Sequence, residues 1–495
     1  MGVLSLENYI LAPRGPNRAN CQTMKYKHVM VLNPYQSDTA ASMGVFPPTG
    51  LEYIAASMKG LVGRISLVDL RQDRSFRNLD KLREFIRKDV DLLCIGIMWR
   101  SKFDKICGLI RTLPPEVTTV VGGQQATLDV EELFAACPNI NMVVRGEGEE
   151  IIKQLVNGAP PSSISGLSYR ENGKVFHNQN APMPDIAALA FPDRSMRRSE
   201  YHWVQNGAKL LSLSFDTILS ARGCPYSCKF CTFSMNPLGQ KREYTERPLE
   251  SVIEELKTIT ADVVLFSDDN FFTNAKRGRE LCRMIVENGI KKTFVVQARI
   301  EVTKSPELLD DAVKAGIKIM LVGIESPHDR ILKQISKGFT QLEVRDAFKV
   351  FNRYPFYIHG YFIYGNIGET DEEMLYIAQF ARELGLDSIS FQKLRIEKFS
   401  PLQRLVESTP GYHYDSIGGP VYSDKYDLAA LKEIRNKIRG RFYTGAQICH
   451  ILGKAGGLGL ISKQDAARLV LNIPLLIYGL AARQVEKARM GKPGK

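Results

Sequence analysis

Residues 220–234 read SARGCPYSCKFCTFS, a stretch with three of the chain's nine cysteines. Cys224, Cys228 and Cys231 directly follow DTILSAR, a β-branched run that predicts a strand. Three thiolates at this spacing can bind three corners of a metal centre and leave a fourth position open. A structural zinc site usually requires a fourth cysteine or histidine ligand, and none follows shortly after Cys231 in the sequence. The spacing therefore favours a four-iron cluster with one open iron over zinc or an incidental arrangement.

A repeating strand–helix rhythm runs from residue 215 to about 400 and predicts a partial (β/α)6 barrel, open on one side. The predicted strands are DTILSAR, ADVVLFSDD, KTFVVQARI, KIMLVGIES, FYIHGYFIYG and SISFQKL. Polar residues collect where these strands end: Asp268/Asp269, Gln297/Arg299, Glu325/Ser326, Gly365/Asn366 and Gln392. Barrel enzymes carry their active sites at the carboxyl ends of the strands, so we expect the cysteines and these residues to share one rim. Tyr361, Tyr364, Gln392 and Phe399 are predicted to line the cavity.

Residues 28–150 show the same alternation and predict a separate doubly wound, Rossmann-like parallel sheet. The predicted strands are 28–34, 64–70, 91–98, 118–123 and 141–149, with amphipathic helices such as 51–61 and 79–89 between them. The class is therefore α/β, with four expected segments: a Rossmann-like domain at 1–155, a linker with a small hairpin around Asn172-Gly173 at 156–212, the barrel at 213–405, and a basic helical extension at 406–495.

Composition excludes several broad classes. The 495 residues are 44% hydrophobic and 24% charged, which is typical of a globular protein of two or three domains. Scattered cysteines indicate a reducing, cytoplasmic setting instead of a disulfide framework. The first residues, MGVLSLENYILAPRG, lack the features of a signal peptide, and no apolar run is long enough to span a membrane.

The positive charge is concentrated in the tail. Residues 420–495 carry 14 Lys/Arg and five Asp/Glu, so +9 of the net +12 lies there. LAALKEIRNKIRGRFY is basic and amphipathic, and residues 469–482 are largely apolar. Two alternatives remain open: a helical cap on the barrel, or peripheral membrane contact through 430–495 at the inner face of the membrane. Nucleic acid is the less favoured partner because no nucleic-acid module is recognisable.

The cysteine loop and the rim resemble the radical S-adenosylmethionine (SAM) enzymes. Cys224, Cys228 and Cys231, with aromatic Phe230 before the last, look like that family's cluster-binding loop. The resemblance implies a [4Fe–4S] cluster whose open iron binds SAM and a 5′-deoxyadenosyl radical that removes a hydrogen atom from an unactivated carbon. It also implies SAM contacts from Phe230, Ser267, Asp268, Asp269, Arg299, Glu325, Tyr364 and Gly365. The alternatives are helix N-caps for the two aspartates and ion pairs for Glu325 and Arg299.

The N-terminal sheet resembles the cobalamin-binding domain of one class of these enzymes, through FPPTGLEYIAA (46–56), VVGGQQAT (120–127) and VVRGEGEE (143–150). The residues implied at a cobalamin site are Asp69, Trp99, Gly122, Gly123, Gln124, Gly146, Glu147 and Gly148, with Met98 beside Trp99. Gly122 and Gly123 would let backbone approach a flat ligand. One departure matters: members that bind cobalt through histidine carry Asp-x-His-x-x-Gly, whereas Arg71 stands at the histidine position here. The alternative is a relict domain without a corrinoid.

The resemblance implies a cobalamin-dependent methyltransferase acting on an unactivated carbon of a small molecule or of a lipid such as a hopanoid. A second reading keeps the radical chemistry without methyl transfer, as a cyclase or carbon–carbon coupling enzyme on a tetrapyrrole or lipid. A third is a non-catalytic corrinoid sensor. Methylthiolation is disfavoured because the N-terminal region lacks clustered cysteines. A flavodoxin or ferredoxin is the expected electron donor.

Overall fold

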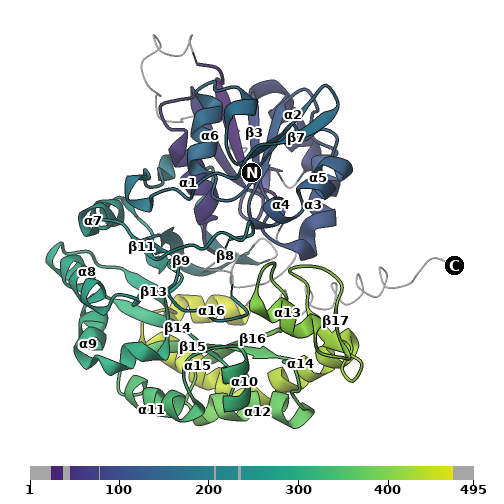
Figure 1. The fold of residues 1–495 in the computed structure, drawn as a ribbon. Coiled ribbons are helices and arrows are strands. Elements are labelled where there is room, and N and C mark those ends of the chain that lie inside the picture. Colours follow the sequence, from purple (N-terminus) through teal and green to yellow (C-terminus); the bar gives the residue numbers. More distant parts are fainter. Residues whose placement is uncertain (1–23, 37–44, 77, 206–207, 232–235, 472–495) are drawn as a thin grey trace. The chain divides into compact units, whose positions relative to one another are not determined.

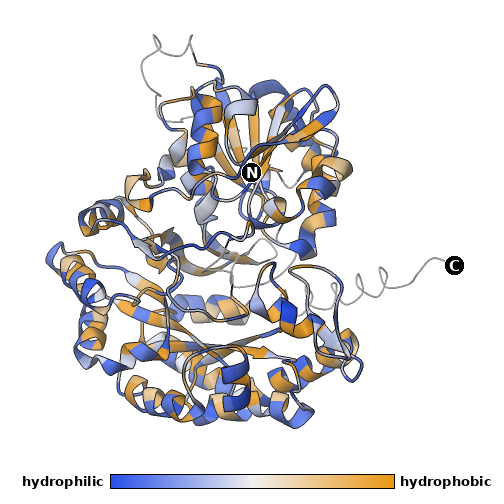
Figure 2. Ribbon diagram, in the orientation of Figure 1, coloured by the Kyte–Doolittle hydropathy of each residue, from blue (hydrophilic) through white to orange (hydrophobic). Residues whose placement is uncertain are grey.

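The computed structural model describes residues 24–36, 45–76, 78–205, 208–231 and 236–471. These residues form two compact units, and each is considered by itself. In both units the strands are the most hydrophobic elements, whereas the helices alternate apolar and polar faces (Figure 2). Among the described residues no helix is long and apolar enough to cross a membrane.

The first unit is a seven-stranded sheet of order β2-β1-β3-β4-β5-β6-β7. Its strands are β1 (His28–Asn33), β2 (Arg64–Asp69), β3 (Leu92–Gly96), β4 (Thr118–Gly122), β5 (Met142–Val144), β6 (Leu167–Glu171) and β7 (Lys174–His177). Its helices are α1 (Thr49–Ser57), α2 (Leu79–Asp89), α3 (Phe103–Ile110), α4 (Gln124–Leu128), α5 (Val130–Ala136) and α6 (Glu149–Val156). The first five strands are parallel, and hydrophobic cores cover both faces of the sheet. The predicted doubly wound sheet is confirmed.

The hairpin predicted around Asn172-Gly173 is present, but it belongs to the first unit instead of to a linker. Both turn residues have positive φ, 50° and 75°, as a two-residue hairpin turn requires. Strand β6 pairs antiparallel with β5, so the hairpin extends the first sheet. The first unit takes in Gly50–Pro184 and Ala188–Ser199, which includes most of the expected linker 156–212. The local sequence predicts the turn. The pairing of β6 depends on the edge of β5, a strand distant in sequence that offers unpaired backbone groups.

The second unit is a seven-stranded sheet of order β16-β15-β14-β13-β12-β9-β8. Its strands are β8 (His202–Gln205), β9 (Ala208–Ile218), β12 (Val263–Phe266), β13 (Thr293–Ala298), β14 (Ile317–Glu325), β15 (Tyr357–Tyr364) and β16 (Ser388–Lys393). The helices between them are α7 (Leu249–Thr258), α8 (Ala275–Glu287), α9 (Pro306–Lys314), α10 (Asp329–Gln334), α11 (Gln341–Phe351) and α12 (Asp371–Glu383). The six predicted strands are confirmed and all run parallel; β8 adds an antiparallel edge.

Strand order decides which face of this sheet is covered. Consecutive strands are neighbours, and right-handed crossovers then place every connecting helix on the same side, as in a barrel. Figure 1 shows α8, α9, α11 and α12 along one side of the strands, and a single large core joins that side to the sheet. We call the opposite side, which these helices leave uncovered, the inner face.

The tail helices α14 (Leu428–Phe442), α15 (Gly445–Gly457) and α16 (Lys463–Leu471) belong to the second unit. The apolar face of α14 is buried: Leu431, Ile434, Ile438 and Phe442 all join the main core. Helix α15 is tied to the start of β16, where Lys454 and His450 contact the buried Asp387 at 2.7 and 2.8 Å. Helix α14 therefore offers no apolar face to a membrane. The apolar run 469–482 lies almost entirely outside the described residues.

Candidate functional site

The cysteine loop begins where the first barrel strand ends. Strand β9 stops at Ile218, and the short strand β10 (Ala221–Arg222) pairs antiparallel with β11 (Thr245–Glu246) just before Cys224. Gly223 has φ +84°, and a Cβ there would lie 2.4 Å from the carbonyl oxygen of Glu243. Only glycine fits this turn, which directs the chain away from the strand and into the loop. The cysteines thus lie at the carboxyl ends of the strands, as predicted.

The two aspartates after β12 hold the base of this loop. Asp268 accepts hydrogen bonds from the backbone NH of Ser220 (2.6 Å) and from its hydroxyl, and Asp269 accepts one from the backbone NH of Gly223 (2.8 Å). Burial raises the pKa of Asp268 to about 6 and that of Asp269 to about 7. The N-cap of α8 is Asn274, so the alternative of these aspartates as N-caps is wrong. They bind loop backbone instead.

None of the three cysteines is in a disulfide bond, and each is partly exposed. The guanidinium of Arg299 lies over the ring of Tyr226 (3.8 Å to its centroid), and its Nη1 lies 3.6 Å from the Sγ of Cys228. No group of three His, Cys, Asp or Glu side chains in the described part of the chain converges on a single ion. Cluster thiolates each bind a different iron, so this donor set still fits a cluster.

Arg299 and Glu325, both predicted to contact SAM, are buried and engaged in ion pairs. Arg299 pairs with Glu301 (2.8 Å) and donates to the carbonyl of Lys337 (2.6 Å), while Glu325 pairs with Lys337 Nζ (2.9 Å). Glu325 has φ +71°, a left-handed conformation that costs a non-glycine residue free energy and is often found at functional sites. The ion-pair alternative is thus confirmed for Glu325. For Arg299 the expected partners, Asp268/Asp269 or Glu325, are wrong, because it pairs with Glu301, which sequence reasoning missed.

Tyr364 and Gly365 occupy the end of β15. The ring of Tyr364 packs into the main core on the helix-covered side of the sheet, so only its backbone faces the rim. Gly365 (φ +75°) starts a turn that Glu369 closes by accepting hydrogen bonds from the backbone NH (2.8 Å) and the side-chain amide (3.1 Å) of Asn366. Sequence reasoning did not single out Glu369; its place after a Gly-Asn turn was the available signal.

Substituting Glu369 tests this turn through pH. Burial raises the pKa of Glu369 from its usual 4.5 to about 7. A raised folded-state pKa means that this residue's contribution to stability is fully present below pH 4.5 and is lost as pH rises towards 7. We expect wild type to lose about 2–3 kcal/mol relative to Glu369→Gln across that window, because glutamine cannot ionise. Anaerobic thermal melts of both proteins at pH 5 and pH 7.5 measure the change; an unchanged difference in Tm contradicts it.

Phe230 and Ser267 also have definite neighbours. Phe230 packs against a small core that includes Ile363 and Ile367, which supports the loop from the β15 side. The hydroxyl of Ser267 lies 3.2 Å from that of Thr49, which in turn donates to Thr217 (2.9 Å). The segment before α1 therefore packs on the inner face of β9 and β12, within the second unit. The sequence had assigned this segment to the N-terminal domain.

In the first unit, the residues predicted to bind cobalamin lie at the carboxyl ends of the strands. Asp69 at the end of β2 is buried, and both of its carboxylate oxygens accept hydrogen bonds from Arg71. Because arginine stands at position 71, the β2 loop presents no imidazole. Met98 and Trp99 follow β3 and are each 44% exposed, while their backbone NH groups donate to the hydroxyl of Tyr35. This edge therefore presents an apolar surface that fits a flat corrin ring without a protein ligand from the β2 loop.

In one of the glycine-rich turns of this unit, close packing against neighbouring backbone explains the glycine. Gly123 (φ +103°) precedes α4, and a Cβ there would lie 2.6 Å from the carbonyl oxygen of Ile97. A Cβ on Gly122 would meet only ordinary contacts, at 3.6 Å. The sequence predicts that both glycines make room for a ligand. At Gly123 the close carbonyl of Ile97, just after β3, is sufficient reason for glycine. The remaining predicted residues lie at helix starts: Gln124 opens α4, and Gly146, Glu147 and Gly148 precede α6.

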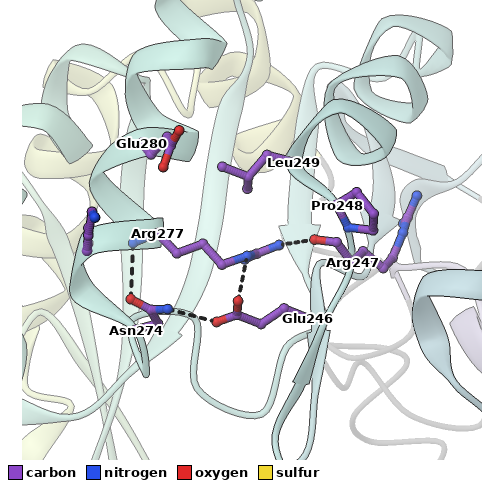
Figure 3. Close-up of a pocket in the computed structure, with 8 residues that line it drawn as sticks. Glu246, Arg247, Pro248, Leu249, Asn274, Arg277 and Glu280 are labelled. Atoms are coloured by element: carbon purple, nitrogen blue, oxygen red, sulfur yellow. Dashed lines mark hydrogen bonds and ion pairs between the residues drawn. The ribbon is translucent and has the colours of Figure 1, made fainter.

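A pocket of about 360 Å³ at the starts of α7 and α8 contains none of the predicted site residues. Figure 3 shows Arg277 at its centre, with Glu246 at 3.4 Å and the carbonyl of Arg247 at 2.8 Å. Arg277 also donates to the carbonyl and hydroxyl of Ser220, the residue that Asp268 binds. This network supports the strand end that leads into the cysteine loop, which gives it a structural role.

Comparisons with known proteins agree with this geometry. Residues 218–381 match the Radical SAM superfamily, and residues 37–156 match the B12 binding domain. An uncharacterized methyltransferase of Pyrococcus horikoshii is 30% identical over 74% of this chain and 80% of its own length. The anaerobic magnesium-protoporphyrin IX monomethyl ester cyclase of Cereibacter sphaeroides is 23% identical over 85% and 71%. The hopanoid C-3 methylase of Methylococcus capsulatus is 26% identical over 56% and 53%.

One solved structure has a similar fold over most of the chain. The radical SAM methyltransferase TsrM of Kitasatospora setae, solved with cobalamin and a [4Fe–4S] cluster, has a TM-score of 0.63 and 17% identity, and the match covers 80% of this chain and 81% of that one. This chain therefore shares the fold of that protein over most of its length.

Proposed function

We propose, from the premise that this chain belongs to the radical SAM enzymes that carry a B12-binding domain, that it is a cobalamin-dependent methyltransferase acting on an unactivated carbon. The observation that carries the proposal is the loop of three cysteines outside any disulfide at the carboxyl end of β9, on the sheet of the radical SAM unit. A doubly wound B12-binding unit precedes it in the chain. Methyltransferases of this architecture are among its relatives.

Cys224, Cys228 and Cys231 are the proposed cluster ligands. The [4Fe–4S] cluster and SAM supply one-electron chemistry that activates a C–H bond, and cobalamin supplies a transferable methyl group. The protein's part is positioning. Asp268 and Asp269 hold the first turn of the loop through Ser220 and Gly223, and the guanidinium of Arg299 lies beside the sulfur of Cys228.

The proposed SAM contacts are Phe230, Ser267 and the backbone at Tyr364–Gly365, together with Arg299 and Glu325. Arg299 and Glu325 are less than a tenth exposed and already hold opposite charges, Glu301 and Lys337. The amino and carboxylate groups of SAM carry both charges. They can therefore replace one partner in each of these ion pairs without leaving a buried charge unpaired. Asp268 and Asp269 act in this proposal through the loop backbone, which they already bind.

The proposed cobalamin surface is the edge with Met98 and Trp99, and its remaining contacts are proposed from Asp69, Gly122, Gly123, Gln124, Gly146, Glu147 and Gly148. Arg71 is locked to Asp69 by two hydrogen bonds of 3.0 and 2.6 Å. The side chain at the usual histidine position is therefore a fixed cation, which cannot ligate cobalt at any physiological pH. A bound corrinoid would therefore receive no cobalt ligand from the β2 loop.

A cyclase or coupling enzyme without methyl transfer is the second candidate, because an anaerobic cyclase matches 85% of this chain. The lack of a histidine suits either activity. A flavodoxin or ferredoxin is the proposed reductant, the proposed location is the cytoplasm, and contact with a membrane is proposed only for the apolar run 469–482.

The deciding experiment uses protein purified anaerobically from cells supplied with cobalamin. We expect about four irons and one cobalt per chain, formation of 5′-deoxyadenosine on reduction, and transfer of label from methyl-labelled methionine into a product of cell extract. Iron without cobalt, or 5′-deoxyadenosine without labelled product, would move the assignment to the cyclase or coupling reading. Absence of iron would refute both.

A further inference from the structure

The inner face of the second sheet divides into an apolar wall and a polar wall. Strand register places Leu265, Val295 and Ile319 side by side, and the next inner-face position of β14 is Leu321. The same rows continue onto β15 and β16 as Tyr357 beside Ile319, and as His359 between Leu321 and Ser388. Hydrocarbon side chains therefore predominate on β12–β14, where the amide of Gln297 lies beside Leu321, and hydroxyl or imidazole groups predominate on β15–β16.

The polar wall has a hydrogen-bonding group to spare. His359 Nδ1 is 2.8 Å from the hydroxyl of Ser388, and its ring packs edge-on against Tyr361 at 4.9 Å between centroids. Within the described residues the Nε2 of His359 has no hydrogen-bond partner. Burial lowers the pKa of His359 to about 4, so the ring is neutral near pH 7 and can accept or donate one hydrogen bond. His359 and Tyr361 are partly exposed, so a ligand can reach them.

The inner-face positions lack charges. From Thr217 on β9 to Gln392 on β16, the paired inner-face residues are hydrocarbon, hydroxyl, amide or imidazole side chains. Two of the charged side chains at the rim, Arg299 and Glu325, are paired with Glu301 and Lys337. A carboxylate or phosphonate placed on this surface would lose its hydration without gaining an unpaired cation, so the surface disfavours binding of the ionised group.

One end of the inner face is closed by the protein itself. Thr49 binds Thr217 and Ser267, and Phe46 packs edge-on against Phe215 at 5.5 Å. The β9 side is therefore covered by a neutral segment, and the polar wall at the opposite end is the side left with an unused hydrogen-bonding group.

Resting on the proposed function, we infer that the substrate is an uncharged, mainly apolar lipid alcohol whose hydroxyl binds His359 beside Tyr361. The apolar wall takes the hydrocarbon body and the polar wall sets its orientation. This substrate class agrees with the hopanoid methylase among the relatives, and it excludes substrates with ionised carboxylates or phosphonates. His359 is a specificity residue in this arrangement, since it binds the substrate's polar end.

Three probes of one skeleton test this inference: a pentacyclic triterpene alcohol, the matching triterpene acid and the matching hydrocarbon. Binding to the full chain, reconstituted anaerobically, is measured by equilibrium dialysis from cyclodextrin. We expect the alcohol to bind at least tenfold more tightly than the acid. Equal or tighter binding of the acid, or no binding of the alcohol, would overturn the inference.

Phenylalanine at position 359 keeps the ring and removes the hydrogen bond. We expect His359→Phe to weaken alcohol binding about tenfold and to leave hydrocarbon binding unchanged. His328→Phe is the matched control, because His328 lies at the start of α10 on the helix-covered side. An unchanged affinity of His359→Phe for the alcohol would refute the role of His359. Iron content and 5′-deoxyadenosine formation on the same preparations report separately on the proposed radical chemistry.

Discussion

Alanine in place of Cys228 is expected to reduce bound iron to less than a tenth of the wild-type content and to abolish SAM cleavage, a loss of at least a thousandfold. A [4Fe–4S] cluster held by three thiolates loses a third of its protein ligands in this variant, and no described cysteine besides Cys224 and Cys231 lies in the loop to replace it. Arg299 then faces a missing thiolate, so the local charge balance also changes. The measurements are iron analysis, visible absorption and anaerobic assay of 5′-deoxyadenosine.

The matched control for this experiment is Cys449→Ser. Cys449 is the exposed cysteine of α15, far along the chain from the loop, and its removal changes the thiol count without touching the rim. Iron content and SAM cleavage of this variant should equal those of wild type. A Cys228→Ala protein with a wild-type melting curve and full iron content would refute the ligand assignment.

Replacing Glu255 with alanine is expected to destabilise the second unit by about 3–5 kcal/mol. The side chains of Arg247 and Glu255 are 1% and 0% exposed, and they pair at 2.5 Å. Arg247 also donates to the carbonyl of Leu219, next to Ser220 at the end of β9. Removing the carboxylate leaves a buried guanidinium without its counter-charge, at a position that supports the cysteine loop. A fall in Tm on the order of 10 °C should be visible by anaerobic calorimetry.

Two further variants separate the buried charge from other causes. Glu254→Ala removes the exposed neighbouring glutamate of α7 and should change stability by less than about 0.5 kcal/mol. The double variant Arg247→Met/Glu255→Leu replaces both charges with apolar groups and should recover most of the loss, since a buried pair and an apolar pair are often close in free energy. A double variant as unstable as Glu255→Ala would show that packing, not an unpaired charge, sets the effect.

The strands and the cysteine loop were predictable because both are local patterns. Runs such as VVLF and TFVVQA bury nearly every side chain, so their composition alone predicts strands of a parallel sheet. Strand order then follows from short crossovers of fixed hand, which places the ends of β9, β12 and β15 at one rim. The positions of Cys224, Asp268 and Gly365 at that rim were therefore accessible from sequence.

Pairing between distant segments was not accessible. Nothing local identifies Lys337 as the partner of Glu325, or the edge of β5 as the partner of β6. The packing of Thr49 against Thr217 joins residues 168 positions apart. Likewise the apolar face of α14 has the same pattern whether it covers a barrel or a membrane, and only its burial in the main core separates the two.

The sequence by itself determined the two α/β sheets, the cluster loop and the missing cobalt-binding histidine, because periodicity and motif spacing are properties of contiguous residues. Only the tertiary structure decided which charges neutralise one another, which wall of the inner face is polar, and where the tail helices pack. Those choices depend on geometry between segments far apart in the chain, where burial makes an unpaired charge or an unfilled hydrogen bond expensive and thereby selects one partner from several.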